Sequence, residues 1–135
     1  STQTDQRGEA LPMVALRIVD SITQLQPADA GCIALSGSHG GASSARYAMA
    51  ARPLLSVFND AGVGKDDAGI AGLAMLQVAG LAACAVSHTS ARIGQADSTL
   101  ADGVVSHANL AARTLGIKPG LALKPQIEQL QRRHA

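Results

Sequence analysis

The feature that most constrains the fold is a short apolar run that recurs three times along the chain. Each run is followed by a polar loop that contains glycine and then by a segment with helical periodicity. The runs occupy residues 32–35, 54–58 and 81–86. Apolar strands without polar alternation, separated by helices, are typical of a parallel sheet that is covered on both faces. We therefore predict an α/β three-layer sandwich with a small parallel sheet of about three to four strands and helices on both faces.

Apolar residues at helical spacing predict the remaining elements. The expected helices cover residues 11–25, 42–52, 70–79 and 97–115. The last of these has an expected buried stripe formed by Leu100, Val104, Ala108, Ala111 and Leu115. Pro125 is expected to open a final helix over residues 125–135, and the polar residues 1–10 are expected to be flexible. Residues 1–135 are thus expected to form a single α/β domain.

Charge and aromatic content exclude two classes of partner. Eleven basic residues stand against ten acidic ones, and the only aromatic rings in the 135 residues belong to Tyr47 and Phe58. We therefore expect no binding to nucleic acid, which needs basic patches or stacking rings. The longest weakly polar stretch, residues 70–86, is too short and too interrupted to span a membrane, so we expect no membrane partner either.

The chain has two cysteines, Cys32 and Cys84, each inside an apolar run, so no disulfide is expected and cytoplasm is the expected compartment. The core must be built from aliphatic side chains with a large share of alanine. Such a core buries little area per residue, so we expect a homo-oligomer.

Unusual polar residues follow each predicted strand. They are Ser36, Ser38 and His39 in the first loop, Asn59, Asp60, Lys65, Asp66 and Asp67 in the second, and Ser87, His88, Ser90 and Arg92 in the third. The carboxyl ends of parallel strands meet at one edge of a sheet, and ligands bind there. We therefore expect one site to be built from three loops.

The first loop partly matches a nucleophile elbow, with Ser38 as the nucleophile and Ser36 where a leading glycine would stand. Asp60 and His88 would complete a catalytic triad in chain order. The backbone N–H groups of Gly40 and Gly41 would hold an anion or an oxyanion. The alternative is that these glycines only form a tight turn.

The second loop contains Gly62-Val63-Gly64-Lys65, which partly matches a phosphate-binding P-loop. The match fails because Asn59 replaces the leading glycine, and Asp66 stands where a Ser or Thr should bind magnesium. We therefore expect no nucleotide cofactor. Lys65 either binds substrate or is a solvated surface residue.

The third loop places donors close together. Arg92 is suited to hold a carboxylate while His88 transfers a proton. The alternative is that His88 caps a carbonyl and Arg92 pairs with an aspartate. His39 and His88 with a second-loop aspartate form a possible metal site, but without diagnostic spacing we expect no metal. His107 is placed near the stripe of the helix over 97–115, as a half-buried residue without a catalytic role.

We expect an enzyme, or the catalytic subunit of one, that acts on a small anionic metabolite by hydrolysis or by lyase-type proton transfer. The expected catalytic residues are Ser38, His39, Asp60 and His88, and the expected substrate-binding residues are Ser36, Gly40, Gly41, Asn59, Lys65, Ser90 and Arg92. The alternatives are a non-catalytic module that binds a small anion and a structural subunit without a site.

Overall fold

The computed structural model describes residues 6–8 and 13–133. Its sheet has five strands in the spatial order β1-β2-β3-β4-β5. They are β1 (Leu16–Val19), β2 (Ile33–His39), β3 (Leu55–Asn59), β4 (Ala82–Val86) and β5 (Val105–Ala108). Strands β1 to β4 are parallel to their neighbours, and β5 is antiparallel to β4. The predicted α/β three-layer fold is confirmed, with more strands than the three to four expected.

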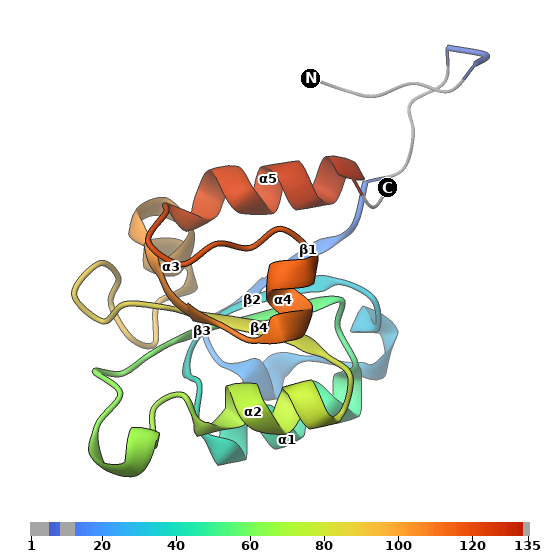
Figure 1. The fold of residues 1–135 in the computed structure, drawn as a ribbon. Helices are drawn as coiled ribbons and strands as arrows, with labels where there is room; N and C mark the ends of the chain where they lie inside the picture. The colour runs from blue at the N-terminus through green and yellow to red at the C-terminus, as the bar shows by residue number, and fades with distance from the viewer. Residues whose placement is uncertain (1–5, 9–12, 134–135) are drawn as a thin grey trace.

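Helices cover both faces of this sheet (Figure 1). One face carries α1 (Ala42–Ala51), α2 (Ala71–Val78) and the 3-10 turn η1 (Ile22–Gln24). The other carries α3 (Ala96–Asp102) and α5 (Leu123–Arg133), with the short α4 (Leu110–Thr114) following β5. Strands β1 to β4 step across the sheet in one direction, so right-handed crossovers place η1, α1 and α2 on the same face.

Side chains of different size fill the two sides of the sheet. Large aliphatic residues such as Leu35 and Val57 pack toward α5, whereas alanines such as Ala83 pack toward α1 and α2. Small residues let α1 and α2 approach closely. The Gly72 N–H donates to the Gly40 carbonyl at 2.8 Å, and a Cβ on Gly72 would lie 2.8 Å from the same oxygen. Gly72 is therefore required by the packing of the two helices.

The predicted helix over residues 11–25 is wrong. The described part of this segment forms β1 and η1, and β1 pairs in parallel with β2, Leu16 opposite Ile33. Its β-branched residues Ile18, Val19 and Ile22 suit a strand end followed by a tight turn. The apolar residues of this segment are spaced along the sequence as in a helix, because a four-residue strand followed by a turn places them at similar intervals.

The predicted helix over residues 97–115 is also wrong, because it is three elements: α3, β5 and α4. Gly103 ends α3, and a Cβ there would lie 2.8 Å from Val86 Cγ1. Asn109 starts α4, since its side chain accepts the Ala112 N–H at 2.9 Å. The residues of the expected stripe therefore do not share one helix face.

Other expected elements are confirmed, with shifted ends. The apolar run at residues 32–35 continues as strand to His39, so Ser36 and Ser38 lie inside β2 and not in a turn. The last helix starts at Leu123, before Pro125. The predicted flexibility of residues 1–10 falls mostly on residues outside the described ones, as does the end of the chain at 134–135. No helix within the described residues is long and apolar enough to cross a membrane.

Candidate functional site

The carboxyl ends of β2, β3 and β4 lie at one edge of the sheet, and each leads into one of the predicted polar loops. Because β5 runs in the opposite direction, it begins at this same edge, with Val105 opposite Val86. Four segments therefore meet at the edge where parallel sheets bind ligands. Three of these segments are the polar loops expected from the sequence, and β5 is the fourth.

Asp60 is anchored at this edge by groups from three segments. Its carboxylate is 7% exposed. Oδ1 accepts the N–H groups of Gly62 at 2.8 Å and His88 at 3.0 Å, and Oδ2 accepts the Ser106 hydroxyl at 2.8 Å. Burial raises the pKa of the Asp60 carboxyl, but the hydrogen bonds from Gly62, Ser106 and His88 together outweigh it and hold the pKa below its ordinary value. Asp60 is therefore ionised at neutral pH.

His88 is oriented by this carboxylate. Its ring nitrogen Nδ1 lies 3.3 Å from Asp60 Oδ1. An ionised carboxylate only accepts, so Nδ1 carries the proton, and Nε2 of the neutral ring is left as the free base. The ring packs on Gly62, where a Cβ would lie 3.6 Å from its Cε1 atom, yet the side chain stays 55% exposed. A buried carboxylate that orients an accessible imidazole is suited to general acid–base catalysis.

Ser106 and His107 extend this network, although the sequence pattern did not point to Ser106 and favoured no catalytic role for His107. The His107 Nδ1 atom lies 3.1 Å from Ser106 Oγ. The Ser106 proton points to Asp60, so Nδ1 of His107 donates to the serine oxygen and its Nε2 is also left unprotonated. The wrong helix over 97–115 placed both residues away from the edge. Gly103 followed by two valines was the available signal for a break and a new strand.

His39 ends β2 and lines a hollow of about 370 Å³ at the same edge. Its Nδ1 accepts the Gly41 N–H at 3.0 Å, so the ring proton lies on Nε2, which is a donor. The second loop contributes Ala61, Val63, Gly64, Ala68 and Gly69 to the lining, and the third contributes Ile93. The hollow therefore takes its lining from all three polar loops.

The second-loop wall of this hollow is strained. Ala61 and Val63 have φ values of 52° and 66°, a left-handed conformation that is rare for a β-branched residue. Gly69 closes the loop, since its N–H donates to the Val63 carbonyl at 2.7 Å and a Cβ would overlap the Asp60 carbonyl oxygen. Strain of roughly 1–3 kcal/mol per residue is found mainly at functional sites.

The predicted elbow at Ser38 is not formed. Ser36 is buried in β2 and donates to the Val57 carbonyl at 2.7 Å, and Ser38 Oγ accepts the Ile22 N–H at 2.9 Å. Neither serine has a hydrogen bond to Asp60 or His88 among the described residues. The strand continues through both serines, so the sharp turn that exposes a nucleophile is missing.

The backbone amides of Gly40 and Gly41, which were predicted to bind an anion, already donate hydrogen bonds within the chain. The Gly40 N–H donates to the Asn59 carbonyl at 3.0 Å, and the Gly41 N–H donates to His39. The Asn59 side chain donates to the Ala91 carbonyl at 3.0 Å and accepts the Ala61 N–H at 2.8 Å. Asn59 therefore ties the second loop to the third and positions the site without facing a ligand.

Three other predicted binding residues lie away from the acid–base pair. Ser90 Oγ donates to the Ser87 carbonyl at 2.8 Å and accepts the Val104 N–H at 2.9 Å, so it shapes its own loop. Arg92 lines a separate hollow along α3. Lys65 is exposed at the start of η3 (Lys65–Asp67).

Within the described part of the chain, no three His, Cys, Asp or Glu side chains gather closely enough to hold a metal ion. Of the predicted catalytic residues, the structure brings Asp60 and His88 together and places His39 in the adjoining hollow. A fold of this kind hosts many activities, so function depends on the site. Comparisons with protein-family models, curated proteins and solved structures found no match for this chain.

Proposed function

We propose that the chain is an enzyme, or the catalytic subunit of one, that performs acid–base chemistry on a small anionic metabolite at the carboxyl edge of the sheet. The pair formed by Asp60 and His88 carries this proposal. Asp60 is buried and held ionised by the groups that donate to it, so it fixes the tautomer and the orientation of His88. The exposed Nε2 of His88 takes a proton from the substrate and returns it.

The hollow beside this pair favours an anionic substrate. His39 Nε2–H is a donor there, and no acidic side chain belongs to the lining. The Gly62 segment connects the two parts of the site, since His88 packs on Gly62 while Ala61 and Val63 line the hollow. The Gly62 segment therefore borders both the base and the hollow in which His39 would bind a carboxylate.

The placement of Ser38 bears on the type of reaction. Its hydroxyl accepts the Ile22 N–H inside β2, so it is not poised as a nucleophile beside His88. Hydrolysis by a water that His88 activates and lyase-type proton transfer both proceed without a covalent serine intermediate. We therefore propose one of these two reactions.

The test is turnover of a panel of small carboxylates, including amides and lactams that bear a carboxylate, followed by proton NMR. His88→Gln should lower the rate on any substrate found by about 10²–10⁴-fold, the usual contribution of a general acid–base residue. Thr89→Ala is the matched control, because Thr89 is the exposed neighbour of His88 and bonds only within its loop, to Ser87. Its rate should not change.

Two outcomes would contradict the proposal. Equal turnover by His88→Gln and wild type would remove His88 from the mechanism. A panel compound that raises the melting temperature without being converted would favour the alternative, a non-catalytic module that binds a small anion.

A further inference from the structure

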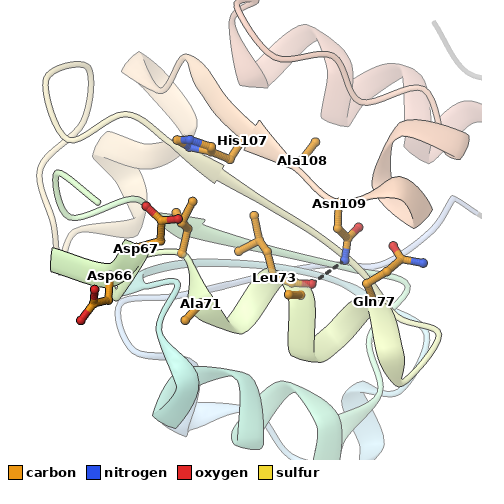
Figure 2. A pocket seen from close by; sticks show the side chains of 10 residues that line it. Asp66, Asp67, Ala71, Leu73, Gln77, His107, Ala108 and Asn109 are labelled. Atoms are coloured by element: carbon orange, nitrogen blue, oxygen red, sulfur yellow. Dashed lines mark hydrogen bonds between the residues drawn. The ribbon is translucent and has the colours of Figure 1, made fainter. Parts of the chain in front are cut away.

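We propose that the hollow between α2 and β5 is a second binding site, which takes a small molecule with an apolar body and a primary ammonium group (Figure 2). The hollow has a volume of about 530 Å³, and small-molecule sites usually have roughly 300–1,000 Å³. It shares no lining residue with the hollow at His39. The two are therefore separate sites on the molecule.

The middle of this hollow is apolar. Ile70, Ala71, Leu73 and Ala74 of the α2 region form one wall, and β5 borders the hollow on the other side at Ala108. The alanines leave space that larger side chains would fill. A compact apolar body, such as one aromatic ring, would bury its surface against these residues.

The polar groups at one end are acceptors. Figure 2 shows His107 and Asp67 at the same end of the hollow. His107 Nδ1 donates to Ser106, so in the neutral ring Nε2 is free to accept a hydrogen bond. The carboxylate of Asp67 adds negative charge beside it. A primary ammonium group has three N–H donors and would satisfy both acceptors.

The other end is closed by two amide side chains, of which one is fully committed. Asn109 donates to the carbonyls of Leu73 and Leu81 and accepts the N–H groups of Ala83 and Ala112. It is therefore a rigid part of the wall. Gln77 Oε1 accepts the Ala111 N–H at 2.8 Å, which fixes that side chain and leaves its Nε2 as a donor for a ligand.

The charge of the lining sets the preference for a cation. Asp66 and Asp67 line the hollow, and among the described residues no Lys or Arg does. An anion would meet two carboxylates without a cationic partner, whereas an ammonium group would be paired. This preference is opposite to that of the hollow at His39, so one probe distinguishes the two sites.

The probe is phenethylamine, titrated into the isotope-labelled 135-residue chain and followed by two-dimensional amide NMR. 3-Phenylpropanoate has the same ring and a carboxylate in place of the ammonium group. We expect amide shifts with phenethylamine confined to η3, α2, β5 and the start of α4, and weaker binding of 3-phenylpropanoate at these residues.

Two variants test the lining. Asp67→Asn should weaken binding of phenethylamine by about tenfold, since it removes a charged hydrogen-bond partner. Asp67 has a φ of 56°, which asparagine adopts readily, so the variant keeps its backbone. Asp97→Asn on α3 is the matched control and should bind as the wild type does. Ala74→Leu should abolish binding, because Ala74 is an exposed helix residue whose enlargement fills the hollow.

The amide spectrum of each variant shows directly whether it is folded. Equal affinity for the amine and the carboxylate, unchanged binding by Asp67→Asn and Ala74→Leu, shifts centred on other elements, or no shifts at millimolar phenethylamine would each overturn the proposal. The test is independent of the acid–base chemistry at His88, because it measures binding at a different hollow.

Discussion

At the residue scale, the charge on Asp60 makes stability depend on pH. Its pKa is lower in the folded chain, so the unfolded chain binds more protons in the acidic range and stability rises with pH. The contribution is complete above the ordinary aspartate pKa of about 4 and is lost as the pH falls through the lower, folded value. Urea unfolding between about pH 6 and pH 3 should show this loss in the wild type and much less of it in Asp60→Asn.

The neutral-pH comparison for Asp60→Asn is also informative. The amide can accept fewer hydrogen bonds than the carboxylate, so the variant should unfold more easily by about 1–3 kcal/mol. Asp102→Asn is the control, because Asp102 is an exposed carboxylate at the end of α3. If Asp102→Asn flattened the pH profile as much as Asp60→Asn does, the anchored carboxylate would not be the cause.

The same residues show how much of the site the sequence predicts. Asp60 and His88 lie within two residues of the ends of buried strands, so recognising the strands was enough to place both at one edge of the sheet. Ser106 could not be placed at this edge, because residues 97–115 were predicted to form one helix and β5 was not recognised within them. Ser38 failed for a different reason: a hydroxyl in a glycine-rich segment is consistent with an elbow, and only the extension of β2 to His39 shows that the chain does not turn there.

At the element scale, α2 is held by one face only. Leu76 is fully buried against the sheet, whereas Val78, two residues later, is 91% exposed. Leu76→Ala should lower the free energy of unfolding by about 2–5 kcal/mol, because it leaves a cavity in the core. Leu121→Ala makes the same kind of truncation at a leucine outside α2 that is 53% exposed, and it should change the free energy of unfolding by only about 0.5 kcal/mol. Urea denaturation of both variants measures the difference, and equal losses would show that α2 is not packed as described.

Elements were predictable from sequence where local and tertiary preferences agree. α1, α2 and β4 have clear stops, such as Gly80 with its φ of 77°, and these elements formed as expected. β1 and β5 are the two edge strands, each four residues long. Strands this short have little periodicity of their own, and they form because a neighbouring strand supplies hydrogen bonds. The sequence pattern therefore predicted the strands in the middle of the sheet correctly and missed the two edge strands.

At the scale of the whole molecule, the helices are better placed than the sheet edges to contact a second copy. Both edge strands are short, which limits pairing between sheets. Next to β5, Val104 forms a β-bridge with Ala122, so the segment around Ala122 already covers part of this edge of the sheet. The large apolar side chains of α5 are not available to contact a second copy, since Leu123, Ile127 and Leu130 are at most 2% exposed within their own chain. Among the described residues, Val78 of α2 is the most exposed large apolar side chain, at 91%, and Leu110 at the start of α4 is 68% exposed.

We therefore propose a homo-oligomer that associates through Val78 of α2. Light scattering at micromolar concentration should return a multiple of the 13.7 kDa chain mass. Val78→Glu should reduce that mass to one chain, because a carboxylate would be buried without a partner at the interface. Glutamate at Leu73 or Leu76 would not test the interface, since both side chains face the core at 6% and 0% exposure and the fold itself would fail. Leu121→Glu is the control at an exposed apolar residue outside α2, 53% exposed, and should leave the mass unchanged. A wild-type mass of a single chain would contradict the assembly, and a Val78→Glu mass equal to that of the wild type would place the interface elsewhere.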